Sequence, residues 1–398
     1  MSVSESVAPS LSVSEAPGPA RPFIPIMRPR LPSAEEIAPW LRMIDGTRWY
    51  TNFGPLETLL RQKLGELAGL SVANSALFSS GTSALHLALE TMVGDRPGLC
   101  IMPAWTHVGT AVAAVSAGLR PYLMDCDPAT WALDPDAVER RARSLDVRAV
   151  VVVAPFGARI DYQAWEEFSR RSSIPVVIDG AAAFDQFVNF GSSIAWGRTP
   201  VMVSLHATKV FGVGEGGLLL SADPDMILRA QESSNFGIKD DRIIDGAIGN
   251  FKMSEYTAAV GLAAFDGWPE RRAQLAELGA AMAAKLAEHG LRARPGFGRD
   301  FVSATCMISA PGRSVEELEA SLAAAGIGTR RWWREGLHKI PQFGAQEQED
   351  LPVTSQIAQS YIGVPFDPDM PSEVIDQVIS AARRPSAAPE VGEPKWMR

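Results

Sequence analysis

The apolar run Ala149-Val-Val-Val-Val-Ala154 restricts the fold of this chain more than any other segment. Consecutive β-branched residues without polar alternation are typical of a strand that is buried on both faces. A second such strand, residues 174–179, follows a helical segment at residues 162–172. Helices must cover both faces of a sheet built from such strands, so the sequence predicts an α/β fold with a mainly parallel sheet.

Two of the predicted strands end at residues that suit a ligand site. In an open α/β sheet, ligands bind beyond the carboxyl ends of the strands, and Asp179 closes the second of the strands above. Gly81, Thr82 and Ser83 lie between a short strand and a helix at residues 84–90. The unpaired N–H groups of a helix N-terminus bind phosphate, although an ordinary helix cap explains the same residues equally well.

The segment from Ser204 to Gly217 carries one lysine, Lys209, shortly before a group of glycines. The amine of Lys209 can lose a proton and form a Schiff base, which a guanidinium cannot do. The glycines let the backbone turn sharply and approach a ligand closely. A surface lysine beside a glycine-rich turn is the alternative interpretation of the same segment.

Gly212, Gly214 and Gly217 also match the G-x-G-x-x-G pattern of dinucleotide-binding proteins. That pattern requires a helix directly after the glycines, whereas residues 218–221 predict a strand. The match stands in the wrong structural context, so we do not expect a nicotinamide cofactor.

The composition excludes several classes of protein. The net charge of −9 argues against nonspecific binding to nucleic acid or to an acidic membrane. The three cysteines are far apart and form no C-x-x-C pair, so neither a disulfide framework nor a metal site is expected. No apolar run reaches membrane-spanning length and no signal-peptide pattern is present, so we expect a cytoplasmic protein.

The length of 398 residues and the pattern along the chain predict two domains. We expect a large ligand-binding domain at residues 33–265 and a smaller α+β domain at residues 266–384, with a strand at residues 301–309. Residues 1–32 are predicted to be a disordered tail, because they are rich in Ser, Ala, Pro and Glu. Residues 385–398 are predicted to be a second flexible tail.

Short motifs recur along the chain in a fixed order and spacing: Asn52-Phe-Gly-Pro55, Ser80-Gly-Thr-Ser-Ala-Leu85, Pro103-Ala-Trp-Thr-His107, Ile178-Asp-Gly-Ala181, Ser204-Leu-His-Ala-Thr-Lys209, Gly214-Glu-Gly-Gly217, Gly249-Asn-Phe-Lys-Met253 and Ala258-Ala259. Together these motifs resemble the DegT/DnrJ/EryC1/StrS family of pyridoxal-phosphate-dependent sugar aminotransferases, which have the aspartate-aminotransferase fold. The resemblance runs from about residue 50 to about residue 384, nearly the whole globular part.

The resemblance assigns roles to individual residues. It implies that Lys209 is the Schiff-base lysine and that Asp179 faces the pyridine nitrogen of pyridoxal 5′-phosphate. The carboxylate would keep that nitrogen protonated, which makes the cofactor an electron sink. The remaining implied cofactor contacts come from Gly81, Thr82, Ser83, His107, Ser204 and Asn250. In the family, the asparagine reaches the phosphate of the neighbouring subunit, which implies a homodimer with shared active sites.

Some positions depart from the family pattern. His107 stands where an aromatic residue commonly stacks on the cofactor, and Ala182 stands where a Gln or His often contacts it. Lys252 replaces a common Arg, keeping the charge but losing the planar fork. His338 matches a histidine in a substrate-side loop, and a solvated loop histidine explains it equally well.

The segment Arg330-Arg-Trp-Trp-Arg334 combines basic and aromatic residues. Its side chains suit a nucleotide diphosphate, with Arg330 as the candidate ligand, but a solvated loop with core tryptophans is an equal alternative.

The resemblance implies transfer of an amino group from an amino acid, with L-glutamate as the implied donor, to a nucleotide-linked keto-sugar. Such chemistry makes amino-deoxysugars for polysaccharides such as lipopolysaccharide O-antigen, or for natural products. A sugar lyase or dehydratase on the same fold is the nearest alternative, and Lys209 speaks against it because related dehydratases carry His there. A non-catalytic regulator is the other alternative, and it would not need the Asp179–Lys209 pair.

Overall fold

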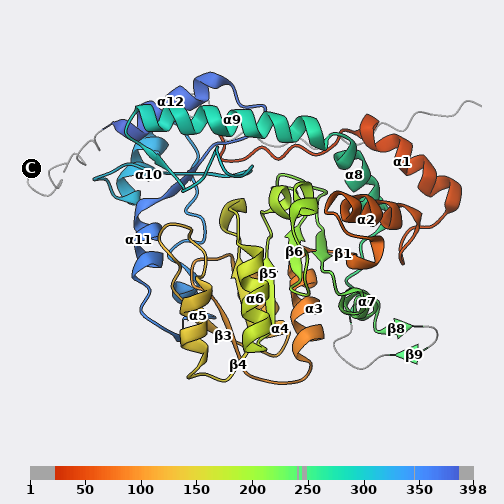
Figure 1. Cartoon of the computed structure of the whole chain (residues 1–398). Helices are drawn as coiled ribbons and strands as arrows, with labels where there is room; N and C mark the ends of the chain where they lie inside the picture. Colours follow the sequence, from red (N-terminus) through yellow and green to blue (C-terminus); the bar gives the residue numbers. More distant parts are fainter. Residues whose placement is uncertain (1–22, 240–241, 244–248, 345, 385–398) are drawn as a thin grey trace, which may run out of the picture.

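The computed structural model describes residues 23–239, 242–243, 249–344 and 346–384, and its core is an eight-stranded sheet between two layers of helices (Figure 1). The strand order is β1-β7-β6-β5-β4-β2-β3-β12, and only β7 runs antiparallel to its neighbours. This confirms the predicted α/β fold with a mainly parallel sheet. Residues 1–22 of the predicted N-terminal tail at residues 1–32, and the predicted tail at residues 385–398, lie outside the described residues.

The strands of the large sheet are short and mostly buried: β1 (Ser75–Phe78), β2 (Leu99–Pro103), β3 (Arg120–Met124), β4 (Val147–Val153), β5 (Val176–Asp179), β6 (Val201–Ser204), β7 (Gly217–Leu220) and β12 (Glu347–Gln348). The helices around this sheet are α1 (Ala34–Thr47), α2 (Pro55–Leu67), α3 (Gly81–Val93), α4 (Val108–Ser116), α5 (Pro135–Ala142), α6 (Tyr162–Ser172), α7 (Pro224–Ser233), α8 (Glu255–Asp266) and α9 (Trp268–Glu288).

Successive residues of the central strands point into two separate apolar layers. In β4, Val150 and Val152 pack in the layer that includes α2, α5, α6 and α8, whereas Ala149 and Val151 pack in the layer that includes α3, α4 and α7. All four side chains are fully buried. The unbroken β-branched run is therefore explained by a strand with helices on both faces.

The parallel arrangement collects several strand ends at one edge of the sheet. β5 ends at Asp179 and β6 ends at Ser204, and the two strands are direct neighbours. β1 runs parallel to β6 because both pair with β7 in the antiparallel sense, so Phe78 ends at the same edge. This edge carries the residues that the sequence assigned to a ligand site.

A second, three-stranded sheet follows the long helix α9, which runs along the top of the view in Figure 1. Its elements are β10 (Arg292–Ala293), β11 (Cys306–Ser309), α10 (Val315–Ala324), α11 (Pro352–Ser360), β13 (Ile362–Val364) and α12 (Ser372–Arg383). We propose to divide the chain near residue 265, because α8 and α9 meet there. A two-stranded hairpin, β8 (Ile238–Lys239) and β9 (Arg242–Ile243), extends at the right of Figure 1.

Two expectations for this second part change in the structure. The backbone of Ile24 forms hydrogen bonds with Gly326 and Gly328, so the N-terminal segment packs against the second part of the chain at this point. Disorder was predicted up to residue 32. The strand predicted from residue 301 begins only at Cys306. Ser303 leaves the extended pattern because its hydroxyl donates to the carbonyl of Phe156, 2.8 Å away.

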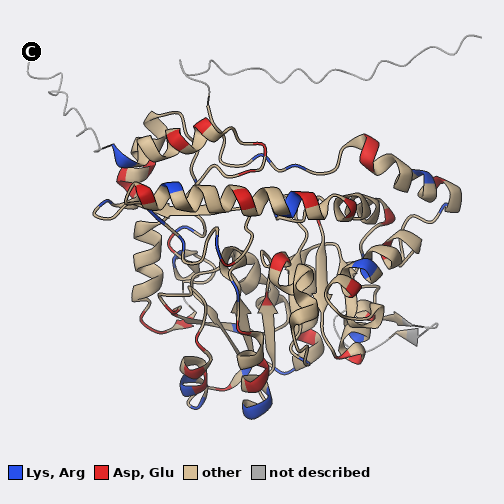
Figure 2. Cartoon of the chain, turned by 45° about the horizontal axis from the view of Figure 1, so that its top comes forward, with Lys and Arg blue, Asp and Glu red and all other residues tan. Residues whose placement is uncertain are grey.

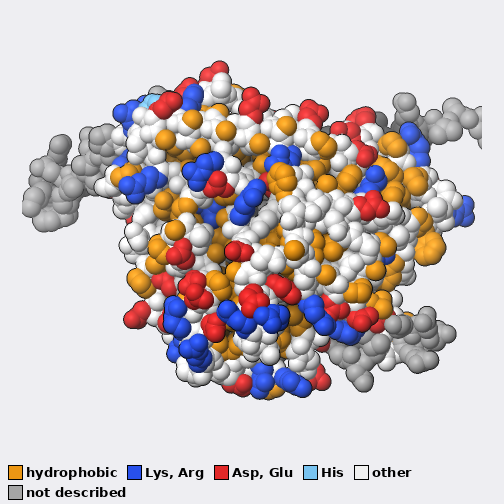
Figure 3. Space-filling model, viewed as in Figure 1, with side chains coloured by type: hydrophobic (Ala, Val, Ile, Leu, Met, Phe, Trp, Pro, Cys, Tyr) orange, Lys and Arg blue, Asp and Glu red, His pale blue; other side chains and the backbone are white. Residues whose placement is uncertain are grey.

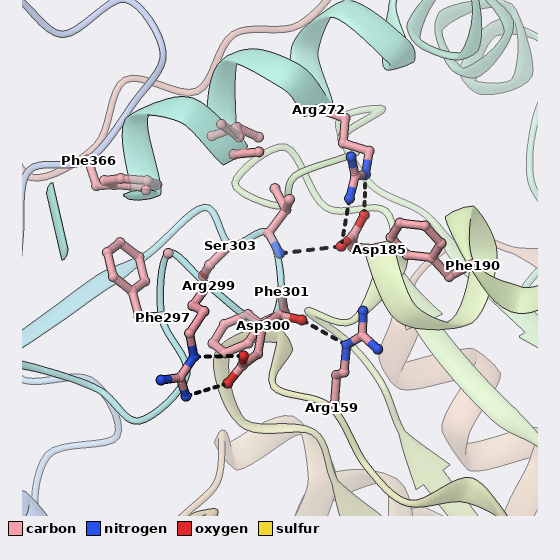
Figure 4. A pocket seen from close by; sticks show the side chains of 15 residues that line it. Arg159, Asp185, Phe190, Arg272, Phe297, Arg299, Asp300, Phe301, Ser303 and Phe366 are labelled. Carbon is pink, nitrogen blue, oxygen red and sulfur yellow. Dashed lines mark hydrogen bonds and ion pairs between the residues drawn. The ribbon is translucent and has the colours of Figure 1, made fainter. Parts of the chain in front are cut away.

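A cavity of about 140 Å³ lies where α9 meets the loop between β10 and β11 (Figure 4). Its cations have anionic partners: Arg272 Nε donates to Asp185 Oδ1 at 2.6 Å, and Arg299 forms an ion pair with Asp300 at 2.9 Å. Arg159 donates to the backbone oxygen of Asp300 at 2.7 Å. Residues of both parts of the chain line this cavity, and its charges are largely matched within the protein. We therefore interpret it as a junction between the two parts.

Charged side chains of both signs are interspersed over the helices, and basic residues gather at the last turns of α5 and α6 (Figure 2). Within the described ranges, none of the helices is long and apolar enough to cross a membrane. The described residues also contain no group of three or more His, Cys, Asp or Glu side chains placed to hold a metal ion.

A buried carboxyl pair joins α2 to α8. Glu255 accepts hydrogen bonds from the N–H groups of Leu56 and Glu57 at 2.8 and 2.9 Å and so caps α2. Glu57 is 1% exposed and lies 3.6 Å from Arg61 Nε. Burial raises the pKa of Glu57 from 4.5 to about 7, Arg61 opposes this rise, and Glu255 adds to it. Folding therefore favours the protonated form of Glu57.

This raised pKa predicts a pH-dependent effect of Glu57→Gln. A carboxyl whose folded-state pKa is raised contributes stability that is fully present below pH 4.5 and is lost as the pH rises to about 7. The variant removes this loss, so its free energy of unfolding should exceed that of the wild type increasingly between these values, by up to about 3 kcal/mol. Denaturant unfolding from pH 4 to pH 8 measures the difference. The exposed Glu66→Gln is the control, and a pH-independent difference for Glu57→Gln would contradict the assignment.

Candidate functional site

Asp179 lies buried at the carboxyl end of β5, with 5% of its surface exposed. The Thr110 hydroxyl donates to its Oδ2 at 2.7 Å, and the N–H of Ala181 donates to its Oδ1 at 3.1 Å. Burial raises the pKa of Asp179, whereas these two donors and the charge of Lys209 oppose the rise. The carboxylate is thus fixed in orientation and lies within electrostatic reach of the lysine.

Lys209 lies in the loop that joins β6 to β7. Its backbone N–H donates to the carbonyl of His206 at 2.9 Å, and Ala207 N–H donates to Gly214 at 2.8 Å. Gly214 has φ +101°, a backbone conformation that residues other than glycine rarely adopt. Burial lowers the pKa of Lys209, and Asp179 opposes this effect. A lysine with a lowered pKa supplies a neutral amine more readily, as nucleophile or as base.

The N-terminus of α3 faces the start of this lysine loop. A Cβ atom on Gly81 would lie 3.0 Å from Ser204 Cβ, and a Cβ atom on Gly217 would lie 2.3 Å from the carbonyl oxygen of Ser80. Only glycine allows this approach at Gly217, because the nearby atom belongs to the backbone. The first N–H groups of α3, at Gly81 and Thr82, therefore lie beside the Ser204 hydroxyl, which is a donor set suited to a phosphate.

Ser83 has a structural task at the same helix end. Its N–H donates to Ser80 Oγ at 3.1 Å, and its hydroxyl donates to the Ser80 carbonyl at 2.8 Å. Its hydroxyl oxygen also accepts the N–H of Ser80, which completes a capping box. The phosphate contact predicted for Ser83 stays a prediction, and its hydroxyl already has partners within the turn.

His107 begins α4, the helix that also carries Thr110. Its Nδ1 accepts the N–H of Gly109 at 3.0 Å, which makes it the N-cap of the helix. Desolvation lowers the pKa of His107, and the charge of Lys209 lowers it further. The structure thus places His107 near the lysine. Ala182 lies in the segment after Asp179, where its methyl group offers no polar contact.

The side chain of Asn250 is exposed. Its Oδ1 accepts from Lys252 Nζ at 2.8 Å, and its backbone pairs with Asn235. Between them, Phe251 accepts the N–H of Ser79 at 2.7 Å. The exposed Asn250 side chain is therefore accessible to a second chain, and its predicted role remains a proposal.

The basic and aromatic segment at residues 330–334 is divided by the fold. Arg331 forms ion pairs with Glu316 at 2.7 Å and with Glu319 at 2.6 Å, so it is held on α10. Arg330 is exposed, with its guanidinium 4.5 Å from the ring centre of Trp332. Arg331 is therefore already paired within the chain, and the substrate contact predicted for Arg330 stays a prediction. Burial and the charge of Lys339 lower the pKa of His338, whereas Glu335 and Asp125 raise it.

An aromatic cluster that sequence reasoning missed lines the same strand ends. Trp333 stacks on Phe156 with ring centres 4.4 Å apart and meets Trp105 at 5.3 Å. Trp131 meets Phe156 at 6.4 Å. Trp131, Phe156 and Trp333 all have positive φ, which is costly for such side chains and marks a constrained region. Thr110 was also missed, although its place just after His107 was a usable signal.

The donor set fits pyridoxal 5′-phosphate, the cofactor that the sequence resemblance implies. A buried carboxylate, a lysine with lowered pKa and a glycine-lined helix N-terminus meet at one edge of the sheet. We propose that Gly81, Thr82 and Ser204 would hold its phosphate, that Asp179 would serve its ring nitrogen, and that Lys209 would supply the amine for its aldehyde.

Comparison with known proteins identifies the group to which this architecture belongs. Protein Rv3402c of Mycobacterium tuberculosis is 31% identical over 382 residues, which cover 93% of this chain and 92% of that protein. The dTDP-4-amino-4,6-dideoxy-D-glucose transaminase of Shigella dysenteriae is 34% identical over 237 residues, covering 60% of this chain and 63% of that protein.

A solved structure of similar fold is a putative pyridoxal-phosphate-dependent aminotransferase from Bacillus cereus. It superposes with a TM-score of 0.82 and 26% sequence identity, over 91% of this chain and 100% of that one. The sequence pattern of the DegT/DnrJ/EryC1/StrS aminotransferase family matches residues 33–383, and the chain therefore belongs to this family.

Proposed function

We propose that this protein is a pyridoxal-phosphate-dependent aminotransferase that moves an amino group from an amino acid to a nucleotide-linked keto-sugar. The observation that carries the proposal is the placement of the half-buried Lys209 and the buried Asp179, which interact electrostatically, beside the N-terminus of α3. A protein that only bound a sugar would have no use for this pair. Membership of the family supports the same reaction.

The residues of this chain have separable tasks in the reaction. When bound, the cofactor withdraws electrons from the substrate carbon whose proton is removed. Asp179, held by Thr110 and Ala181, maintains the negative charge that this withdrawal requires. The Nζ of Lys209, with its lowered pKa, takes the proton from the substrate Cα and delivers a proton in the following step. The N–H groups of Gly81 and Thr82 and the hydroxyl of Ser204 hold the phosphate.

The two substrates react in turn at this one site, which gives ping-pong kinetics. The amino acid leaves its nitrogen and departs as a keto acid, and the keto-sugar then collects the nitrogen. The similarity to a transaminase named for a dTDP-linked amino sugar supports a nucleotide-linked acceptor. L-Glutamate is the proposed donor.

Exposed apolar side chains support a homodimer as the working unit. Trp49, Tyr50 and Tyr256 are 49, 49 and 51% exposed, and Tyr50 stacks on Tyr256 with ring centres 6.2 Å apart. Phe236 and Ile243 are 46 and 72% exposed in and beside the β8–β9 hairpin. Figure 3 shows hydrophobic side chains gathered toward the right-hand edge, near α1 and α2. A second copy would cover such patches, and Asn250 would then reach the partner's phosphate site.

Lys209→Ala should abolish covalent attachment of the cofactor and lower turnover by at least about 100-fold, because one amine serves as nucleophile and base. Borohydride reduction of the loaded wild type, followed by peptide mass spectrometry, should find the cofactor on the Lys209 peptide. Lys285→Ala, which removes an ion pair with Asp376 on the surface, is the control. Attachment to another lysine would show that the site is wrongly assigned.

A nucleotide-linked 3- or 4-keto-6-deoxy sugar should accept nitrogen from L-glutamate at least about 100-fold more efficiently than the free sugar. The diphosphate offers several charge-assisted hydrogen bonds, each worth roughly 1.5–3 kcal/mol, that the free sugar lacks. Mass spectrometry of amino-sugar formation compares kcat/KM for the matched pair. Equal efficiency, or activity only between amino and keto acids, would overturn the sugar claim and leave the cofactor claim intact.

Hybrid dimers test the shared site. In a dimer of one Lys209→Ala chain and one Asn250→Ala chain, sharing places the intact lysine and the intact asparagine in one site and both lesions in the other. Activity should therefore return in purified hybrids that carry two different affinity tags, relative to either parent. Hybrids no more active than the parents, with dimer formation verified by mass, would place Asn250 in its own chain's site or outside both.

A further inference from the structure

The hydrogen bond at the start of α4 fixes which nitrogen of His107 carries the proton. Nδ1 accepts the N–H of Gly109 at 3.0 Å, and a ring nitrogen that accepts a hydrogen bond cannot carry a proton in the neutral ring. The proton of neutral His107 is therefore on Nε2. The free edge of the ring presents a hydrogen-bond donor, and protonating Nδ1 would break the cap of the helix.

The charged groups that face His107 favour this neutral form. Desolvation and the charge of Lys209 lower the pKa of His107, Asp179 raises it, and Arg330 and His206 lower it. A neutral ring with its proton on Nε2 cannot accept a proton at its free edge. His107 is thus suited to donate a hydrogen bond to an oxygen and unsuited to act as a general base.

The loop that carries Arg330 closes over the strand end that leads to His107. Leu337 N–H donates to the carbonyl of Ala104 at 2.8 Å, and Trp333 packs against Trp105. Arg331 is held by Glu316 and Glu319, whereas Arg330 has no carboxylate partner among the described residues. A cation without a carboxylate partner among the described residues and a neutral donor thus lie on two segments that pack against each other.

We propose that Arg330 and the Nε2–H of His107 together bind the α-carboxylate of the amino-acid donor. This inference rests on the proposed aminotransferase function and specifies how it recognises its first substrate. The α-carboxylate is attached to the carbon whose nitrogen is exchanged, so it must bind close to Lys209. The diphosphate of a nucleotide sugar is attached at the anomeric carbon, which is not bonded directly to the keto carbon of a 3- or 4-keto sugar. An anion-binding pair near Lys209 therefore matches the carboxylate better than the diphosphate.

Two substitutions of His107 distinguish a stacking role from a hydrogen-bonding role. If the ring only stacks on the cofactor, His107→Phe should bind the donor at least as well as the wild type. If Nε2–H is the donor, His107→Gln should retain most affinity, because its amide nitrogen can occupy a similar place, and His107→Phe should lose it.

The test follows the first half-reaction, which needs no sugar. Loaded enzyme is mixed with L-glutamate, and the absorbance change of the cofactor gives the donor's apparent Kd. Arg330→Met and His107→Phe should each raise the apparent Kd for L-glutamate by about 10- to 100-fold, the range of a charge-assisted hydrogen bond. The double variant should raise it by less than the product of the two single effects. Arg299→Met and His289→Gln, which alter an arginine and a histidine away from the site, are the matched controls.

Two amides of glutamate identify which carboxylate is bound. L-Isoglutamine lacks the α-carboxylate and L-glutamine lacks the side-chain carboxylate. The wild type should discriminate strongly against L-isoglutamine, and Arg330→Met should lose this discrimination while its preference between glutamate and glutamine stays the same. Variants that bind L-glutamate like the wild type, or that lose affinity for all three compounds equally, would overturn the proposal.

A readout independent of turnover comes from nitrogen NMR of the ring. The chain has five histidines, so each resonance can be assigned by substitution. His107 should show an unprotonated Nδ1 and a protonated Nε2, and 2-oxoglutarate should shift the Nε2 signal in the wild type but not in Arg330→Met. A protonated Nδ1, or a shift that survives in Arg330→Met, would contradict the proposal. Absence of any half-reaction in the wild type would instead refute the proposed function, and the NMR result would still decide the binding claim.

Discussion

The placement of a buried carboxylate at the end of β5 near a half-buried amine in the loop after β6 is the constraint on which the rest of this structure depends. Burial disfavours the charged form of both Asp179 and Lys209, and each group partly restores the charge of the other. Thr110 and Ala181 add hydrogen bonds to the carboxylate. These contacts hold only if β5 and β6 keep their register, which the fully buried β-branched side chains on both faces maintain.

The two parts of the chain meet through aromatic packing as well as through the charged contacts of the cavity beside α9. Trp333, from the part after α9, stacks on Phe156 at the end of β4 and reaches Trp105 beyond β2. The positive φ of Trp131, Phe156 and Trp333 shows that the surrounding contacts override the local preference of these residues. The same packing determines where Arg330 lies, because only two residues separate it from Trp333.

Local signals explain how much the sequence could predict. The apolar, β-branched runs predicted β4 and β5, with Asp179 at the end of the second strand. Contacts between distant residues explain the failures. Nothing local shows that Glu316 and Glu319 would bind Arg331, and α11 was not predicted, since its N–H groups are held by Asp125 from another part of the chain. The individual roles of the site residues remain predictions for the same reason.

The ion pairs between Arg331 and α10 have a consequence for how such a site can diverge. Glu316 and Glu319 touch no residue of the lysine loop by any contact described above, yet they determine how many free guanidinium groups the neighbouring segment offers. Losing both Glu316 and Glu319 would release a second positive charge next to Arg330, while every group around Asp179 stayed unchanged. Substitutions on an outer helix can therefore change the charge around Arg330, while the groups around Asp179 stay the same.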